Sequence, residues 1–355
     1  MSKRCVACLF ACLLANVLAL LASAQPRNDL RVMEYNVENL FDTLHAVGHQ
    51  DVEFTPQGDH QWGSARYWAK LSRLSKVIAA TGGATPIDLV ALVEVENDSV
   101  VYDLTKRTKL WHMGYEYVMT HSADARGINV ALLYLPHRFK VLSKDSIRIM
   151  PPLAKQRMTR DVLHVVGKLV TDDTLDVFVC HFPSRRGGKM AQRYRSLVAQ
   201  RLRCAADSII ANRQHPYLLI TGDFNGYYPE PFLRNDLGVK LLNHADTSRP
   251  IPFSNLYLLT HQLQGRADVC GTYKFQGAWN QLDHFVVNGA FLSPSASLHI
   301  SSAGSACRIV DFPFLLQSNK SGQGGVHPFR SYLGTYYQGG YSDHLPIVLD
   351  ITFGE

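Results

Sequence analysis

Short runs of apolar residues, separated by turn residues, recur along the chain and predict a fold dominated by β-strands. The Asp172-Asp173 pair lies between two such runs, as expected for a hairpin turn. The earliest run begins at Arg31 and ends at Asn36, so this strand delivers a polar group at its carboxyl end. The runs that we predict as strands are residues 31–35, 88–94, 129–134, 162–170, 175–181, 217–220, 282–287 and 347–351.

Two longer segments have the apolar period of amphipathic helices. The first is expected to begin at Ser64, whose hydroxyl suits an N-cap, and to end at Gly82-Gly83. The second covers about residues 190–211. The apolar side chains that the first helix is expected to bury are Trp68, Leu71, Leu74, Val77 and Ile78.

The first 24 residues have the order of features found in a secretory signal peptide. Lys3 and Arg4 are positive, an apolar run follows over residues 5–21, and small residues at 22–24 suit cleavage after Ala24. The alternative, a membrane anchor, fits less well because the run is short for a spanning helix and no basic stop-transfer flank follows it. We therefore expect an exported protein, periplasmic or extracellular, whose mature chain has no stable membrane insertion.

The composition is that of a globular protein. Among 355 residues, 46% are hydrophobic and 19% are charged, which excludes disordered, collagenous and multi-span membrane classes. Length alone favours two domains. The formal net charge of +6 is mild, so it does not by itself indicate a nucleic-acid partner.

Four of the seven cysteines remain after signal cleavage. Cys180 lies in an apolar strand-like run and is expected to be a buried free thiol, and Cys204 lies in a helical pattern. Export permits disulfides, so Cys270 and Cys307 are the one pair considered. Two free thiols are the alternative, because the sequence does not give their Cα separation.

Polar side chains lie at or next to the ends of several predicted strands. Taken singly, each has a simpler explanation: a carboxylate can cap a turn, and Asp223 can form an Asx-turn. The order and chemistry of the whole set favour a functional site instead. Its members are Asn36, Glu38, Glu94, His181, Asp223, Asn225, Asp283, Asp343 and His344.

Six motifs contain these residues. They are Tyr-Asn-Val-Glu-Asn-Leu-Phe-Asp at 35–42, Leu-Val-Glu-Val-Glu-Asn at 92–97, His-Phe-Pro-Ser-Arg at 181–185, Gly-Asp-Phe-Asn at 222–225, Leu-Asp-His at 282–284 and Ser-Asp-His-Leu-Pro-Ile at 342–347. In this order they resemble the endonuclease/exonuclease/phosphatase superfamily. The most similar branch is the secreted bacterial one, often described as predicted extracellular nucleases, in which Arg126-Gly127-Ile128 is also familiar. One departure is Val93, where many members have a Gln that supplies a supporting hydrogen bond.

The resemblance implies an α/β fold of the deoxyribonuclease I type, a four-layer α/β/β/α sandwich of two mixed β-sheets flanked by helices. Because the first and last motifs must meet in one cleft, it also implies a single catalytic domain over residues 25–355. The implied reaction is phosphoester hydrolysis by water attack on phosphorus, with Mg²⁺ as cofactor and Mn²⁺ or Ca²⁺ as alternatives. Mg²⁺ prefers oxygen ligands and keeps several waters. The metal-binding residues implied are Glu94, supported by Asn36 and Glu38, and Asp343.

The resemblance also implies roles for five catalytic residues. His344 is a general base or an electrostatic clamp on the phosphate, and Asp283 holds its imidazole. Asp223 orients or deprotonates the attacking water. Asn225 and His181 donate hydrogen bonds to phosphoryl oxygens. Which of Asp223 and His344 removes the proton stays open from the sequence.

The substrate class depends on one basic segment. Residues 184–213 contain eight basic residues and one acidic residue. The basic ones are Arg185, Arg186, Lys189, Arg193, Arg195, Arg201, Arg203 and Arg213. The segment is either a solvated helix face or a track for a polyanion, and we predict that Arg185, Arg186 and Lys189 bind substrate because they closely follow His181.

No long apolar hairpin suited to a lipid bilayer is evident, so the sequence favours nucleic acid as the substrate, cleaved by an endonuclease acting on DNA or RNA. The alternative is a secreted phosphomonoesterase or lipid phosphodiesterase that uses the same site. A non-catalytic binding module is disfavoured because all six motifs are present. No protein partner is implied.

The later part of the chain adds aromatic residues and glycines near the last motifs. The aromatic residues are Tyr273, Trp279, Phe329, Tyr332, Tyr336, Tyr337 and Tyr341. They either stack on bases or sugars or pack in the core. Glycines between residues 322 and 340 predict a loop beside the cleft.

Overall fold

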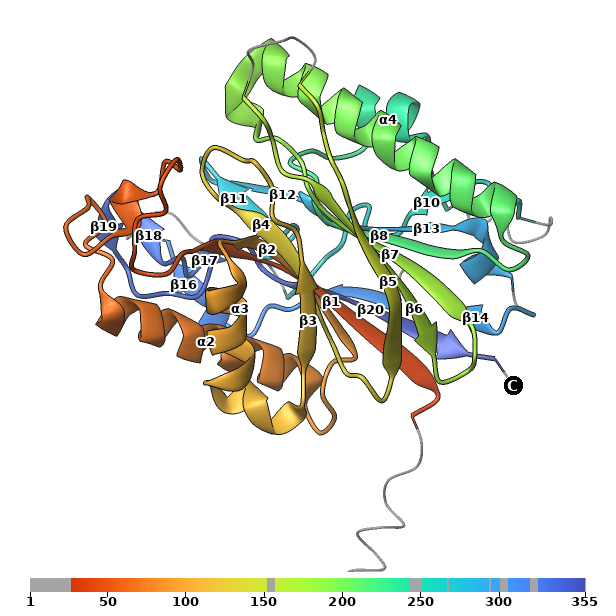
Figure 1. The fold of residues 1–355 in the computed structure, drawn as a ribbon, viewed down its shortest axis with the longest axis horizontal. Helices are drawn as coiled ribbons and strands as arrows, with labels where there is room; N and C mark the ends of the chain where they lie inside the picture. The colour runs from red at the N-terminus through yellow and green to blue at the C-terminus, as the bar shows by residue number, and fades with distance from the viewer. Residues whose placement is uncertain are drawn as a thin grey trace, which may run out of the picture.

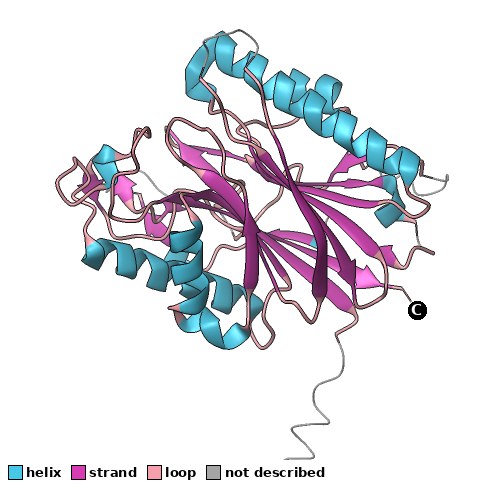
Figure 2. Cartoon of the chain, in the orientation of Figure 1, coloured by secondary structure: helices cyan, strands magenta, loops and turns pink. Residues whose placement is uncertain are grey.

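The computed structural model describes residues 27–151, 157–242, 251–266, 268–293, 295–300, 306–319 and 325–354. The predicted signal peptide, residues 1–24, lies outside the described residues. Two seven-stranded mixed sheets stack on each other, and helices cover both outer faces (Figures 1 and 2). This is the four-layer α/β/β/α sandwich that the motifs implied.

The first sheet has the strand order β14-β20-β1-β2-β4-β3, and β15 also pairs with β20. In this sheet β1 pairs in parallel with β2 and antiparallel with β20. The first and last strands of the described chain are therefore neighbours. Its strands are β14 (Leu298–His299), β20 (Ile347–Phe353), β1 (Asp29–Leu40), β2 (Leu89–Val95), β4 (Asn129–Tyr134), β3 (Glu116–Met119) and β15 (Cys307–Ile309).

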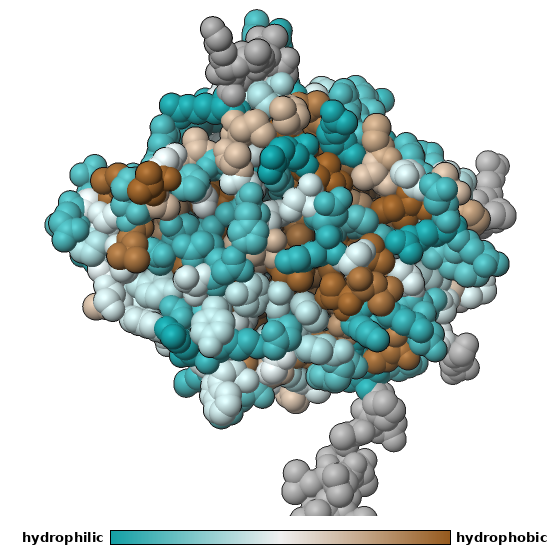
Figure 3. All heavy atoms as spheres, viewed as in Figure 1, coloured by the Kyte–Doolittle hydropathy of each residue, from teal (hydrophilic) through white to brown (hydrophobic). Residues whose placement is uncertain are grey.

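The second sheet has the order β5-β6-β7-β8-β13-β10-β9. Its strands are β5 (Phe139–Ile147), β6 (Val162–Leu169), β7 (Thr174–His181), β8 (Tyr217–Asp223), β13 (Asp283–Asn288), β10 (Leu256–Leu258) and β9 (Val239–Leu241). β5 lies at the edge, where exposed Lys140, Lys144 and Asp145 disfavour pairing with another chain. In Figure 3, apolar side chains gather around this edge, and Leu142 is 52% exposed.

The helices complete the outer layers. α2 (Ser64–Gly82) and α3 (Asp98–Lys106) cover the first sheet, and α4 (Gly188–Asn212) covers the second (Figure 1). Successive side chains of β7 point to opposite faces. Val177 and Val179 therefore pack in the core between the sheets, whereas Phe178 and Cys180 pack in the core under α4, together with Leu202.

Three small hairpins lie outside the two sheets. They are β11 (Tyr273–Phe275) with β12 (Ala278–Asn280), β16 (Leu316–Ser318) with β17 (Val326–Pro328), and β18 (Tyr332–Leu333) with β19 (Tyr336–Tyr337). The glycine-containing stretch predicted as a loop thus holds three short strands. The short helices are η1 (Val52–Phe54), η2 (Lys109–Met113), η3 (Arg185–Gly187), η4 (Phe232–Leu237), η6 (Gly289–Leu292) and η7 (Pro313–Leu315). Among the described helices, none combines the length and apolarity required to cross a membrane.

Two details of α2 differ from the prediction. Its N-cap is Gly63, so Ser64 is already helical and makes no capping hydrogen bond. Trp68 is 39% exposed, because the buried stripe runs through Tyr67, Leu71 and Leu74, and Trp68 lies about 100° further around the helix. The helix still packs on the sheet as predicted.

The four cysteines of the described chain are free thiols. Cys180 is buried, as predicted, beneath α4. Cys307 is buried in β15, whereas Cys270 is exposed. The disulfide considered between Cys270 and Cys307 is therefore absent.

Candidate functional site

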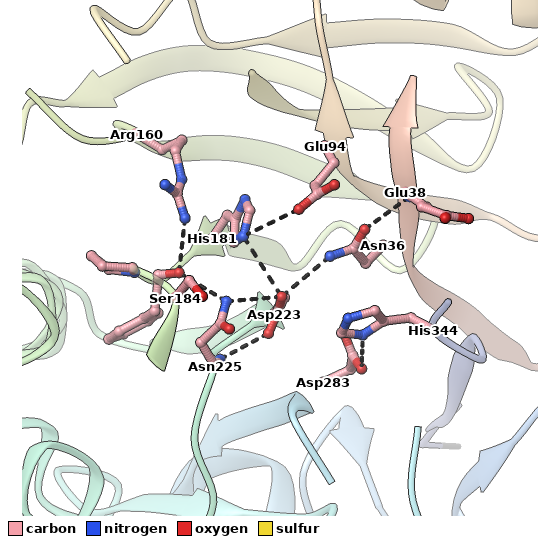
Figure 4. A network of polar contacts seen from close by, with 12 residues as sticks. Asn36, Glu38, Glu94, Arg160, His181, Ser184, Asp223, Asn225, Asp283 and His344 are labelled. Carbon is pink, nitrogen blue, oxygen red and sulfur yellow. Dashed lines mark hydrogen bonds and ion pairs between the residues drawn. The ribbon is translucent and has the colours of Figure 1, made fainter. Parts of the chain in front are cut away.

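Strand register brings three of the predicted catalytic side chains together. In the second sheet His181 of β7 is the register partner of Asp223 of β8, and Asp223 is the partner of Asp283 of β13. Asn36, at the end of β1 in the other sheet, donates through Nδ2 to Asp223 Oδ2 at 3.2 Å. The site therefore lies between the two sheets, at the ends of strands that are distant in sequence (Figure 4).

Asp283 and His344 form the hydrogen bond that the sequence analysis predicted. His344 Nδ1 lies 2.8 Å from Asp283 Oδ2, and the two residues are 6% and 0% exposed. Burial opposes the imidazolium, but the Asp283 carboxylate outweighs it and raises the pKa of His344 well above its ordinary value. The Tyr273 ring packs on the imidazole with centroids 4.8 Å apart. His344 is thus a fixed, positively charged group.

Asp223 is the centre of the hydrogen-bond network in Figure 4. Its Oδ1 accepts from the backbone N–H of Asn225 at 2.8 Å, and its Oδ2 accepts from Asn225 Nδ2 at 3.0 Å. Burial raises the pKa of Asp223 to about 7, with Asp283 adding to the increase and His344 opposing it. A carboxylate with this pKa can take up a proton near neutral pH.

Asn225 positions Asp223 through both of its amide hydrogens. Besides Asp223, Asn225 Nδ2 donates to the carbonyl of Phe182 at 3.0 Å. No amide hydrogen is left for a substrate in this arrangement. The structure therefore gives Asn225 a positioning role, in contrast to the role as phosphate donor that the resemblance implied.

His181 lies between two carboxylates. Its Nε2 is 3.8 Å from Glu94 Oε1 and 3.6 Å from Asp223 Oδ2. Burial lowers the pKa of His181 well below its ordinary value, and the cations Arg160 and Arg126 lower it further. The imidazole is therefore neutral, with one nitrogen available as a hydrogen-bond donor.

A bulge in β2 turns Glu94 into the site. Val93 and Val95 pair with Val130 and Asn129 of β4, which leaves Glu94 unpaired, with a φ of 67°. Its Oε2 accepts from the backbone N–H of Asn39 at 2.9 Å. No hydrogen bond to a described residue engages Glu94 Oε1, so this oxygen suits a cation.

Glu38 points away from this cluster in Figure 4. Its two carboxylate oxygens accept from the backbone N–H groups of Ser331 at 2.6 Å and Tyr332 at 3.2 Å, and Lys70 Nζ is 3.8 Å away. Burial, reinforced by Asp343, raises the pKa of Glu38 to about 7. In place of the metal-supporting role predicted from sequence, this carboxylate anchors the segment that leads into β18.

The described residues fit a divalent cation through hard oxygen donors. Asp223, Asp283 and His344 have ligand atoms within 4.8 Å of one another. His344 is charged and bound to Asp283, so this trio is unsuited to direct coordination. Glu94 and Asp343 are the better ligands, because no described residue forms a hydrogen bond to Glu94 Oε1 or to the half-buried Asp343 carboxylate.

Two residues of the site carried no recognisable signal in the sequence. Arg160, 8% exposed, donates through Nη2 to the carbonyl of Phe182 at 2.9 Å and lies near Glu94 and Asp223. Glu34 is fully buried in β1, and no hydrogen-bond partner is found for either carboxylate oxygen. Burial, with Asp283 and Asp223, raises its pKa well above the ordinary value. Arg160 adds positive charge to the site, and Glu34 is a neutral carboxylic acid behind it.

The predicted substrate-binding residues lie directly after the strand that carries His181. Arg185, Arg186 and Lys189 are exposed on η3 and the first turn of α4. Arg185 lies over the Tyr227 ring at 4.8 Å. Arg186 is close enough to Tyr273, the ring on His344, to lower its pKa electrostatically. These three cations therefore lie beside the site.

The rest of the basic segment is engaged elsewhere. Arg195 is 4% exposed and donates to the carbonyl of Pro183 at 3.3 Å. Arg203 pairs with Asp207, and Arg213 with Asp176. The segment is thus not a continuous cationic track, and its cations available to a substrate are concentrated at its start.

Residues 31–352 match a family model described as the Endonuclease/Exonuclease/phosphatase family. No curated protein matches the chain.

Solved structures share the fold. A Bacteroides vulgatus endonuclease/exonuclease/phosphatase is 14% identical, with a TM-score of 0.56 over 92% of this chain and 100% of that chain. D. rerio TDP2, complexed with a single strand DNA product, is 15% identical, with a TM-score of 0.54 over 92% of this chain and 99% of that chain. A Bacteroides thetaiotaomicron mannosyl-6-phosphatase is 14% identical, with a TM-score of 0.54 over 91% of this chain and 100% of that chain.

Proposed function

We propose that this chain, which belongs to the Endonuclease/Exonuclease/phosphatase family, is an exported, divalent-metal-dependent phosphodiesterase that cleaves nucleic acid. The family comprises phosphoester hydrolases. The observation that carries the proposal is the buried Asp283–His344 hydrogen bond of 2.8 Å beside Asp223. It places a proton acceptor next to a fixed positive charge, as hydrolysis of a phosphoester requires.

In this proposal Asp223 takes the proton of the attacking water. His344 is held as an imidazolium by Asp283, so it acts as a hydrogen-bond donor and charge clamp toward a phosphoryl oxygen. Asn36 and Asn225 fix the carboxylate of Asp223 from two sides. These contacts favour Asp223 over His344 as the general base.

Glu94 and Asp343 are the residues that would hold a divalent cation, Mg²⁺ in the first instance. The cation, when bound, supplies neutralisation of the phosphate charge and stabilisation of the leaving oxygen. Neutral His181 donates a hydrogen bond to a phosphoryl oxygen from its place between Glu94 and Asp223. Arg160 adds a buried positive charge to the same region.

Nucleic acid as substrate is supported by Arg185, Arg186 and Lys189, which lie beside the site and suit phosphates on either side of the scissile one. The TDP2 structure with a single strand DNA product is consistent with this substrate class. A phosphomonoesterase is the second candidate, favoured by the fold shared with a mannosyl-6-phosphatase.

The test is a panel of substrates offered to the purified mature chain with Mg²⁺, Mn²⁺ or Ca²⁺ and with EDTA. Single-stranded and duplex DNA, RNA, sphingomyelin, sugar phosphates and bis-p-nitrophenyl phosphate cover the candidate classes. We expect metal-dependent cleavage of a nucleic acid at the highest kcat/KM. Full activity in EDTA contradicts the metal dependence, and preferential release of inorganic phosphate or choline phosphate contradicts the nuclease assignment.

A further inference from the structure

A small cavity adjoins the site on the side of the loop that follows β1. Its volume is about 140 Å³, and its lining includes Phe54, His60, Trp62, Arg330, Tyr332 and Asp343. Asp343 directly precedes His344, and Asn39, which also lines the cavity, holds Glu94 through its backbone N–H. We call this cavity the aromatic pocket. A group bound there lies next to a phosphate held in the site.

The wall of the aromatic pocket is a rigid stack of rings. Phe54 lies between Phe41 and His60, with ring centroids 4.5 Å away on each side. Trp62 Nε1 donates to the carbonyl of Phe41 at 3.0 Å, and the Tyr332 hydroxyl donates to the carbonyl of His60 at 2.8 Å. The polar atoms of these two rings are therefore already engaged within the wall, which is preformed for a ligand.

The polar side chains of the pocket differ in whether they are engaged. Glu38 and Ser331 are bound to each other and to Lys70. In contrast, within the described chain no hydrogen bond or ion pair engages the side chain of Arg330 or Asp343, and both residues are half-buried. The pocket therefore offers a guanidinium donor and a carboxylate acceptor to a ligand.

The size and ring arrangement of the pocket restrict the ligand. Sites for drug-sized molecules are about 300–1,000 Å³, so a cavity of about 140 Å³ takes a single ring at most. A nucleobase binds best on an open aromatic face. Both faces of Phe54 are covered by other rings, and Trp62 is only 1% exposed. The pocket thus lacks a stacking platform and suits a ring rich in hydroxyl groups.

We propose that the aromatic pocket binds the sugar ring that carries the scissile phosphate, with Arg330 donating to its hydroxyl oxygens and Asp343 accepting from its hydroxyl groups. This inference rests on the proposed phosphoester hydrolysis and specifies the substrate of that site. A monosaccharide phosphate and a nucleotide both present such a ring, so a pentose and a hexose are separate arms of the test.

The test compares binding of inorganic phosphate, ribose 5-phosphate, mannose 6-phosphate and thymidine 5′-monophosphate by calorimetry. The protein is the mature chain with Glu94→Gln, a background in which the proposed function predicts no turnover. Arg330→Met is introduced into it, with Arg330→Lys as the conservative variant. The matched control is Arg234→Met, because Arg234 is exposed and forms no ion pair with a described residue.

We expect Arg330→Met to weaken binding of at least one sugar phosphate about 10-fold or more, the loss expected for a hydrogen bond from a charged group. Inorganic phosphate should change less than about 2-fold, and Arg330→Lys should recover part of the loss. Arg234→Met should bind all four ligands as the parent does. Whether the pentose or the hexose is affected identifies the class of sugar.

Three outcomes overturn the proposal: no loss in Arg330→Met, an equal loss for inorganic phosphate, or a loss confined to thymidine 5′-monophosphate. The last one assigns the pocket to the base. Failure of the wild-type chain to hydrolyse any phosphoester removes the proposed function. The binding comparison still decides whether the aromatic pocket recognises sugar.

Discussion

The Asp283–His344 pair allows the strongest test of the catalytic assignment, through the variant Asp283→Asn. The two side chains are hydrogen-bonded at 2.8 Å and are almost fully buried. At an effective dielectric constant of about 20, unit charges about 4 Å apart attract by about 4 kcal/mol. One pKa unit corresponds to about 1.36 kcal/mol, so removal of the Asp283 charge should lower the pKa of His344 by about 2 to 3 units.

The same loss should appear in catalysis. If the imidazolium stabilises charge in the transition state, about 3 to 4 kcal/mol corresponds to a fall in kcat of about 100- to 1,000-fold. The assay is hydrolysis of bis-p-nitrophenyl phosphate, a small substrate that does not depend on the basic segment. The pKa of His344 is followed separately by NMR titration of its ring carbon in wild type and variant.

The chain contains a matched control in a second His–Asp pair. His164 Nε2 lies 2.8 Å from Asp176 Oδ1, and Asp176 is fully buried. Asp176 lies five residues before His181 on β7, about 17 Å away at about 3.3 Å per residue. Both Asp176→Asn and Asp283→Asn should lower the free energy of unfolding, by about 3 to 5 kcal/mol. Only Asp283→Asn should lower kcat.

The pH dependence of stability gives the sign of the effect. The pKa of folded His344 is raised above its ordinary value, because Asp283 outweighs burial. Its contribution to stability is therefore fully present below about pH 6.5 and is lost as the pH rises through the raised value. The difference in unfolding free energy between wild type and Asp283→Asn should be largest in acid. An unchanged kcat, or an equal fall in Asp176→Asn, would refute the assigned role of the pair.

Three further predictions concern the cation, the proton acceptor and the basic residues. Glu94→Gln should abolish calorimetric binding of Mg²⁺ and cost several kcal/mol of transition-state stabilisation in kcat/KM; unchanged Mg²⁺ affinity contradicts this assignment. Because burial raises the pKa of Asp223 to about 7, kcat/KM should rise with pH through this region when the base ionises; a flat profile between about pH 5 and 8 excludes Asp223 as the base. Triple replacement by alanine should weaken DNA binding and reduce its logarithmic salt slope by about 0.7 to 0.9 per lost contact, without affecting bis-p-nitrophenyl phosphate; equal effects on both substrates argue against a polyanion. The residues replaced are Arg185, Arg186 and Lys189.

Most of the fold could be predicted because apolar period and strand burial coincide. The strand predicted at residues 129–134 has those bounds in the structure, and the others differ at their ends by a few residues. β5 was missed because it lies at a sheet edge, where Leu142, Lys144 and Asp145 are all exposed and no apolar alternation develops. The strands of two or three residues, such as β18, are too short to show any period.

The candidate site was predictable as a set of residues but not as a geometry. The sequence places polar groups at strand ends, yet the register that makes Asp223 the neighbour of both His181 and Asp283 depends on pairing between distant strands. The direction of Glu38 depends on a register shift of β1 between Asn36 and Leu40, which no local pattern indicates.

Backbone strain explains why those directions are hard to derive from sequence. Glu38, Asn39, Glu94 and Asn225 all have positive φ, between 48° and 67°, a region that side-chain-bearing residues seldom adopt. Each such residue costs about 1 to 3 kcal/mol, which the surrounding sheets must offset. Local preference therefore opposes the geometry that the site needs, and only the packing of two complete sheets imposes it. A sequence reader who follows local preference will find which residues gather at the site and will mistake where some of them point.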